Sequence, residues 1–172
     1  MSSIFPQYRA ETDRYWFYVI GMTTPNTIQL ASVRVISDDL PRLVRFYEVL
    51  TGATPRYLTD DFVELVTPSA TFAVSSPDRV AFITENTPRG SANNSAIVEF
   101  LVEDTEALYE KLKAEFGDEL DVVQTPTMMP WGNLSVLIRD PDGALINLYT
   151  PVTPDAQQLQ ENRTPRMLPA SS

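Results

Sequence analysis

The residue types that perform most catalytic chemistry are scarce in this chain. It has no histidine and no cysteine, which excludes the usual base near neutral pH, imidazole or thiolate metal ligands, and disulfides. The remaining candidates for proton transfer or ligand contact are Glu64, Glu99, Trp131 and Tyr149. No second catalytic group with a fixed partner accompanies them, so the sequence favours binding over catalysis.

Charge and composition restrict the partners. The formal net charge is −10, and the 13 basic residues are scattered, whereas recognition of phosphate backbones needs clustered Lys and Arg. We therefore expect no nucleic acid, and a cationic small molecule suits the charge. Every apolar run is shorter than the roughly 18 residues that span a bilayer. With no basic signal-peptide region and no cysteine, we expect a cytoplasmic protein without a membrane partner.

Two segments that match at an offset of 65 residues must position these groups. Val33 to Gly52 aligns with Val98 to Gly117, so an internal duplication is predicted. Each copy starts with a strand-like alternation, continues with Asp39 or Asp104 as helix N-cap and an apolar helical stripe, and ends at glycine. Tyr47 lies on that stripe and is expected in the core.

Strand candidates follow each helix, so each copy is predicted to be a βαβββ module of an α+β fold. In the first copy they are Thr54–Leu58 with Phe62–Val66, Ala70–Val74 and Val80–Thr84; in the second they are Asp121–Gln124, Leu134–Arg139 and Ala144–Tyr149. The turns Ser76–Asp78 and Asp140–Gly143 are interpreted as equivalent.

The predicted organisation is one domain with two extensions. Residues 1–28 form an N-terminal extension, and the domain spans 29–153. Within it, module one is 30–84, the linker is 85–94 and module two is 95–151. Residues 154–172 are polar and rich in proline, which predicts a flexible tail or an arm over a partner subunit.

Three motifs resemble the vicinal oxygen chelate superfamily, which includes glyoxalase I, the extradiol dioxygenases and the bleomycin-resistance proteins. They are DLPRLVRFYEVLTG after the first strand, PWG at Pro130–Gly132 and DPDGALINLYTP from Asp140. The resemblance covers about Leu30 to Pro151 and implies that the mixed sheets of two tandem modules pair into a U-shaped cleft. It also implies a homodimer.

The same resemblance locates a metal site that lacks its ligands. Metal-dependent members typically place two histidines and a glutamate where this chain has Ser32, Ile97 and Asn147. Iron or zinc needs imidazole or carboxylate donors, which these side chains do not supply. No metal and no cofactor are expected. An all-oxygen magnesium or manganese site using Glu64 and Glu99 is the less favoured alternative.

Strand alternation extends the set of side chains that face the cleft. It adds the neighbours of those three positions at two-residue steps, which gives Ser32, Arg34 and Ile36; Ile97, Glu99 and Leu101; and Leu145, Asn147 and Tyr149. The opposite phase is apolar and should pack under the helices: Val33, Val35, Val98, Phe100, Ile146 and Leu148.

Arg34 and Glu99 occupy equivalent places in the two modules. We favour a structural ion pair between them, because buried charges are normally paired. The alternative is that one of them binds a charged substituent of the ligand. Glu99 would also act as a base if desolvation raised its pKa, and Tyr149 is a second weak candidate for catalysis.

Trp131 is the candidate for stacking on a flat ligand, with Met128 and Met129 beside it. An equal alternative is that the three residues close the edge of the core.

Two functions follow. The favoured one is a metal-free protein that binds an aromatic or cationic small molecule through Ser32, Arg34, Ile97, Glu99, Met129, Trp131, Asn147 and Tyr149, with antibiotic sequestration as an analogy at the level of the fold. The alternative is a lyase, isomerase or dioxygenase with a carboxylate base or an atypical metal site. A regulatory or interaction module is a third option.

Overall fold

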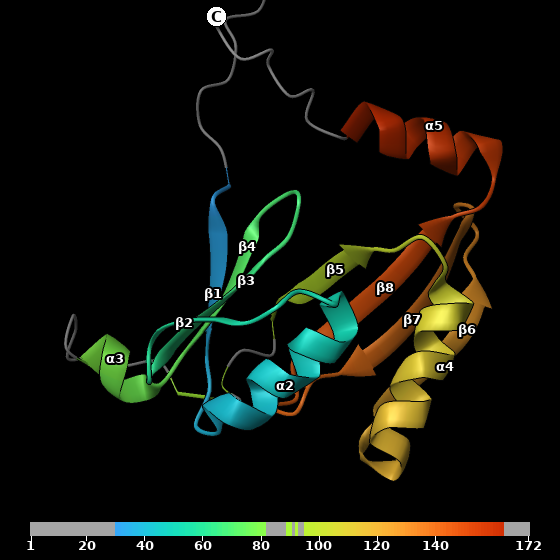
Figure 1. Ribbon diagram of the computed structural model, residues 1–172. Coiled ribbons are helices and arrows are strands. Elements are labelled where there is room, and N and C mark those ends of the chain that lie inside the picture. Colours follow the sequence, from blue (N-terminus) through green and yellow to red (C-terminus); the bar gives the residue numbers. More distant parts are fainter. Residues whose placement is uncertain (1–29, 82–88, 91, 93–94, 164–172) are drawn as a thin grey trace, which may run out of the picture. The chain divides into compact units, whose positions relative to one another are not determined.

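The computed structural model describes residues 30–81, 89–90, 92 and 95–163 (Figure 1). The described elements belong to one compact unit that starts at Ser32. The first module contains β1 (Ser32–Ile36), α2 (Leu40–Thr51), β2 (Arg56–Thr59), β3 (Phe62–Val66), β4 (Thr71–Ser75) and the short α3 (Pro77–Ala81). Its four strands form a mixed sheet in the order β1-β4-β3-β2, with β1 parallel to β4.

The second module repeats this plan. It contains β5 (Ile97–Leu101), α4 (Thr105–Phe116), a 3-10 turn at Gly117–Glu119, β6 (Asp121–Met128), β7 (Asn133–Arg139) and β8 (Leu145–Pro151). Its sheet has the order β5-β8-β7-β6, with β5 parallel to β8. Two tandem βαβββ modules with open mixed sheets confirm the predicted α+β fold class.

Both long helices begin and end as the sequence predicts. The Asp39 carboxylate accepts a hydrogen bond from the backbone N–H of Arg42 at 3.2 Å, and that of Asp104 accepts one from Ala107 at 3.0 Å. Each bond pairs an N–H that the helix leaves without a partner. Gly52 ends α2 with φ of +68°, a left-handed conformation that only glycine adopts without strain.

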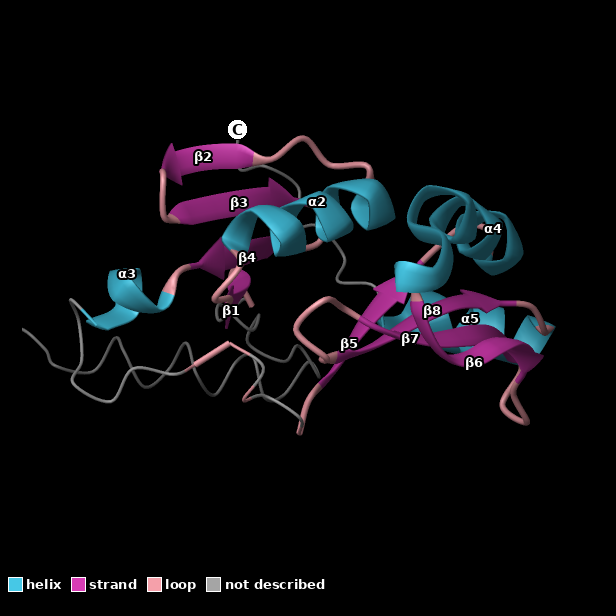
Figure 2. Ribbon diagram, turned by 90° about the horizontal axis from the view of Figure 1, so that it is seen from below, coloured by secondary structure: helices cyan, strands magenta, loops and turns pink. Residues whose placement is uncertain are grey.

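One helix covers one face of each sheet, and the two helices join the modules (Figure 2). In that view α2 lies over β3 and β4, and α4 lies over the second sheet. Phe46 of α2 packs on Phe116 of α4, and Lys111 donates to the Val49 carbonyl oxygen at 2.8 Å. The buried residues of both modules form a single hydrophobic cluster.

Tyr47 is the centre of that cluster and is fully buried, as predicted. Its ring packs on Phe72 of the first sheet at 4.1 Å between centroids and on Phe100 of the second at 6.2 Å. Its hydroxyl donates to Asp140 Oδ2 at 2.8 Å. One side chain of the first module is therefore bonded to the turn between β7 and β8 of the second.

Two predictions for the end of the first module are wrong where the structure describes it. Val80 lies in α3 rather than in a strand, because β2, β3 and β4 already complete the sheet; residues 82–84 lie outside the described residues. The turn equivalent to Asp140–Gly143 is Thr67–Ala70, which joins β3 to β4 as Asp140–Gly143 joins β7 to β8. Most of the predicted linker, 85–94, also lies outside the described residues, as do residues 1–28.

The C-terminal segment differs from the predicted flexible tail, because Pro154–Arg163 form helix α5. Its residues have almost no amphipathic pattern, so no helix was predicted here. The fold supplies the helix start instead: Thr153 caps it by accepting from the backbone N–H of Ala156 at 3.3 Å, and Ala156 is buried. Residues 164–172 lie outside the described residues. Within the described residues, no helix has both the length and the apolarity to cross a bilayer.

Candidate functional site

The face of the second sheet opposite α4, called here the second open face, carries the predicted site residues of β5 and β8. Ile146 and Leu148 are fully buried on the α4 side, so Leu145, Asn147 and Tyr149 point the other way. Val98 and Phe100 pack against the core, which places Ile97, Glu99 and Leu101 on the open face. In the first module Val35 also packs against the core, whereas Val33 stays 40% exposed instead of packing under the helix.

Glu99 and Asn147 form a hydrogen-bonded pair on this face. They are direct partners in the β5–β8 register, and Asn147 Nδ2 donates to Glu99 Oε1 at 2.8 Å. Because the amide nitrogen faces the carboxylate, the orientation of the Asn147 side chain is fixed. Its carbonyl oxygen Oδ1 is buried and has no hydrogen-bond partner, which leaves an unsatisfied acceptor.

Ser135 is a second unsatisfied group on the same face, which the sequence reasoning missed. It lies on β7 directly opposite Tyr149 and one diagonal step from Asn147. Its side chain is 2% exposed, and its hydroxyl has no hydrogen-bond partner. Extending the strand phase to β7 would have found it, because Val136 and Ile138 mark the buried face of that strand.

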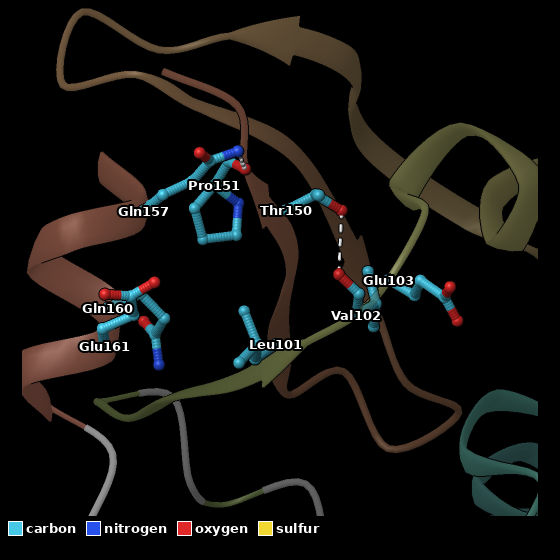
Figure 3. A pocket seen from close by; sticks show the side chains of 8 residues that line it. All are labelled: Leu101, Val102, Glu103, Thr150, Pro151, Gln157, Gln160 and Glu161. Carbon is cyan, nitrogen blue, oxygen red and sulfur yellow. Dashed lines mark hydrogen bonds between the residues drawn. The ribbon is translucent and has the colours of Figure 1, made fainter. Parts of the chain in front are cut away.

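Tyr149 connects the open face to helix α5. Its hydroxyl donates to Gln160 Oε1 at 3.1 Å, and a pocket of about 510 Å³ lies between α5 and the ends of β5 and β8 (Figure 3). The pocket is lined by Leu101, Val102, Glu103, Thr150, Pro151, Gln157, Gln160 and Glu161. The tail prediction left α5 without a role in the site, so its residues were also missed.

The first sheet places Arg34 differently from the expectation of an ion pair. The Arg34 guanidinium lies 4.3 Å from the centroid of the Phe62 ring, a cation–π contact. Among the described residues Arg34 and Glu99 form no ion pair with each other, so that interpretation is wrong. The reason is topological: β1 and β5 belong to separate sheets, and each charge has a partner within its own sheet.

Ser32 and Glu64 lie on the same face of the first sheet as Arg34. In the strand register, Arg34 is opposite Ala73, and Ala73 is opposite Glu64. Ser32 is exposed at the start of β1. The predicted site residues are thus divided between two sheets, with Ser32 and Arg34 in one and the remainder in the other.

Trp131 lies in the turn between β6 and β7 and is 61% exposed. This exposure disfavours the alternative that it closes the edge of the core. The turn is tightly held, since Gly132 has φ of +90° and a Cβ there would collide with Thr153 Oγ1. Met129 is turned back towards the sheet, where its sulfur accepts from Gln124 Nε2 at 3.7 Å. In the strand register Gln124 pairs with Leu137, and Leu137 pairs with Asn147, so these three side chains lie on the same face of the sheet.

The residues at the three positions of the family's metal ligands do not fit a transition metal. Ile97 has no donor atom, the neutral Ser32 hydroxyl is a poor ligand for iron or zinc, and the amide nitrogen of Asn147 is bonded to Glu99. Within the described part of the chain, no three carboxylates are grouped so that they could hold a metal ion. Glu99 is also exposed, so it lacks the buried environment in which a carboxylate acts as a general base.

Among the described residues, the two groups whose pKa values are perturbed, Tyr47 and Asp142, lie away from the open face. Burial raises the pKa of Tyr47 far above its usual range, and the neighbouring Asp140 carboxylate adds to the effect. Burial also raises the pKa of Asp142, and the charges of Asp140, Asp38 and Asp39 raise it further. Both groups belong to the junction between the modules rather than to a catalytic centre.

Comparison with known proteins agrees with this architecture. The chain is similar to the structure of a glyoxalase/bleomycin resistance protein/dioxygenase from Nocardioides, with a TM-score of 0.64 and 18% identity over 83% of this chain and 95% of that one. It is also similar to a glyoxalase/bleomycin resistance protein/dioxygenase family enzyme from Burkholderia phytofirmans PsJN, with a TM-score of 0.61 and 14% identity over 73% of this chain and 100% of that one. For a glyoxalase-related enzyme from Fulvimarina pelagi, the TM-score is 0.60 and the identity 19%, over 74% of this chain and 94% of that one. At these identities the likeness shows the fold alone.

Sequence comparison gives the family. No curated protein matches the chain significantly. The sequence profile of one superfamily matches residues 29–148, which include both modules as far as β8. The chain belongs to the Glyoxalase/Bleomycin resistance protein/Dioxygenase superfamily.

Proposed function

We propose that the chain binds an aromatic or cationic small molecule on the second open face without a transition metal. The observation that carries this proposal is the Glu99–Asn147 pair, which stands where metal-dependent relatives are expected to have a ligand. The pair fixes the Asn147 amide so that its unsatisfied oxygen is an acceptor. A ligand that donates a hydrogen bond there would satisfy it.

The energetics favour a ligand with hydrogen-bond donors. A buried polar group without a partner destabilises a protein by about 1–3 kcal/mol. Asn147 Oδ1 and Ser135 Oγ are two such atoms on one face. Both are covered, so the side chains above them move aside when the ligand enters. The Glu99 carboxylate adds negative charge, and the net charge of −10 favours the approach of a cation.

Apolar contacts complete the proposed site. Ile97 and Leu101 expose 55% and 51% of their surface on the same face, which suits the body of an aromatic ligand. Trp131, exposed in its turn, provides a stacking surface. In one form of this proposal, the chain acts as a homodimer that sequesters an aromatic, cationic antibiotic.

A ligand screen with matched variants tests the proposal. Aromatic compounds with a protonated amine are screened by thermal shift, and each hit is measured by calorimetry against Asn147→Leu, Trp131→Ala and Arg34→Leu. Loss of one buried hydrogen bond predicts about tenfold weaker binding for Asn147→Leu. Arg34→Leu, at the position of the first sheet that is equivalent to Glu99, should bind as the wild type does. Equal affinities of Asn147→Leu and the wild type, or no hits, would contradict the proposal.

Metal analysis tests the metal-free part separately. The protein is purified without chelators, and its zinc, iron, manganese and nickel contents are measured by plasma mass spectrometry. We expect far less than one metal ion per chain, because Ser32, Ile97 and Asn147 are poor donors. A stoichiometric transition metal that is lost in Asn147→Leu would instead place a metal at this face.

A further inference from the structure

Helix α5 and the ends of β5 and β8 line the open pocket introduced above, which lies beside the second open face. Figure 3 shows Gln157, Gln160 and Glu161 on α5 facing Leu101 and Pro151 across it. At about 510 Å³ the pocket is within the usual range for small-molecule sites, roughly 300–1,000 Å³.

The strand side of the pocket is fixed by hydrogen bonds. Thr150 Oγ1 donates to the Val102 carbonyl oxygen at 2.9 Å, and the Val102 N–H donates to the Tyr149 carbonyl oxygen at 3.0 Å. Thr105 Oγ1 lies 2.8 Å from Thr150 Oγ1 and ties both strands to the start of α4. The β5 end therefore keeps its position relative to β8.

The helix side is fixed as well. The Gly132 carbonyl oxygen accepts from the N–H groups of Val152 and Thr153, which holds the chain just before α5. Tyr149 then bonds Gln160 in the second half of the helix, at 3.1 Å. Both walls are thus held by bonds made without a ligand, and a preorganised pocket loses less entropy on binding.

The lining chemistry selects a cation with an apolar body. Two acidic residues, Glu103 and Glu161, and two glutamines are among the eight lining residues, none of which is basic. The Glu161 side chain extends from α5, whereas the Glu103 carboxylate is directed away from that helix (Figure 3). Neither carboxylate forms an ion pair with another described residue. The Gln157 amide nitrogen lies 3.4 Å from the carbonyl oxygens of Pro151 and Val152, which turns its own carbonyl oxygen outward as a further acceptor.

We propose that the α5 pocket binds a protonated alkylamine, with the ammonium near Glu161 and the alkyl chain on Leu101 and Pro151. An ammonium has three donors and no acceptor, which complements a lining of acceptors. Leu101 is 51% exposed, so an alkyl chain removes apolar surface from water there. This site goes beyond the proposed open-face ligand: the two sites share Leu101, but the pocket does not depend on Glu99 or Asn147.

The experiment titrates the full-length protein with hexylamine, which is protonated at pH 7, and follows backbone amides by 1H–15N NMR. Hexanol and hexanoate have the same alkyl chain without the positive charge. We expect hexylammonium to shift the amides of Leu101, Glu103, Gln160 and Glu161, hexanol to do so more weakly and hexanoate not at all. Shifts that cluster elsewhere, or equal shifts with hexanol, would overturn the proposal.

Two double variants separate the pocket from general charge. Glu103→Gln/Glu161→Gln should weaken hexylammonium binding about fivefold, since a partly exposed ion pair with Glu161 contributes up to roughly 1 kcal/mol and Glu103 adds only a more distant charge. Glu106→Gln/Glu119→Gln removes the same charge from exposed positions on and after α4 and should bind as the wild type does. Equal weakening in both variants would show only a general charge effect and overturn the site.

The open-face variant distinguishes the two proposals. Asn147→Leu should leave the hexylammonium shifts unchanged, because Asn147 is not among the lining residues of the α5 pocket. Loss of open-face binding with retained pocket binding supports a separate amine site. Loss of hexylammonium binding in Asn147→Leu would overturn the independence of the pocket.

Discussion

The two open faces have the same backbone plan and opposite chemistry. In each sheet the first strand runs parallel to the last over five residue pairs, from Ser32–Thr71 to Ile36–Ser75 and from Ile97–Leu145 to Leu101–Tyr149. At the third pair, the first sheet has Arg34 opposite Ala73 and the second has Glu99 opposite Asn147. Arg34 stacks on an aromatic ring, whereas Glu99 holds an amide.

This difference shows which parts of a duplicated fold are constrained by folding. The apolar phase under the helices is retained in both modules, because a change there would lose buried area. The open phase is free of that constraint, so its residues have diverged. Among the described residues, each face has a carboxylate and a buried hydroxyl without a partner, Glu64 and Ser75 on the first and Glu99 and Ser135 on the second. The second face adds the fixed amide of Asn147, and it is the face beside which α5 forms a pocket.

The largest expected effect concerns Tyr47, which packs against the sheets of both modules. Tyr47→Ala removes an aromatic ring that packs against both sheets and should lower the free energy of unfolding by about 3–5 kcal/mol. Tyr47→Phe leaves Asp140 Oδ2 without its donor and should lower it by about 1–3 kcal/mol. Urea unfolding followed by circular dichroism measures both changes.

The same variants test whether the modules unfold together. Native-state hydrogen exchange compares the amides of Ala73 in β4 and Val136 in β7, one central strand from each sheet. We expect Tyr47→Ala to weaken the protection of both by the same free energy, because one hydrophobic cluster includes residues of both modules. Wild-type protection at Val136 would show that the second module is stable alone.

The next effect is opposite in sign and confined to the second face. Asn147→Leu removes the unsatisfied oxygen and should raise the free energy of unfolding by about 1 kcal/mol while it abolishes the proposed ligand contact. Higher stability with weaker binding is the pattern of a residue kept for function. Lower stability of Asn147→Leu would instead assign the Glu99–Asn147 pair a structural role.

A smaller effect belongs to the first face. Arg34→Gln removes the guanidinium from the Phe62 ring and should lower the free energy of unfolding by about 0.5–1 kcal/mol, the usual contribution of an exposed cation–π contact. Arg34→Lys keeps the charge and should recover part of that loss. Denaturant titrations of the three proteins measure the difference. A loss in Arg34→Gln that Phe62→Leu does not reproduce would contradict the contact.

The fold could be predicted because its signals are local and occur twice. Asp39 and Asp104, the glycines after each helix and the apolar phases of β5 and β8 all act within a few residues. The Glu99–Asn147 pair could not be predicted, because it depends on the register between β5 and β8, which are 48 residues apart at this contact. Helix α5 was missed for a related reason, since Thr153 and Gln160 gain their roles only from the strands beside them.

The smallest effect compares the two equivalent turns, Asp140–Gly143 and Thr67–Ala70. Burial raises the pKa of Asp142, so the folded protein holds that proton more tightly than the unfolded chain does. Ionisation of Asp142 therefore disfavours folding, and this loss of stability grows as the pH rises through the pKa of the folded state.

Asp142→Asn removes the charge and should have a slightly higher Tm at pH 7. Its advantage should shrink as the pH falls through the pKa of the folded state and should be lost below about 4, where Asp is protonated in the unfolded chain too. Ser69→Asn, in the neutral turn of the first module, should show no such pH dependence by calorimetry. A constant difference between Asp142→Asn and the wild type from pH 3 to pH 8 would mean that the effect comes from packing in the turn and not from charge.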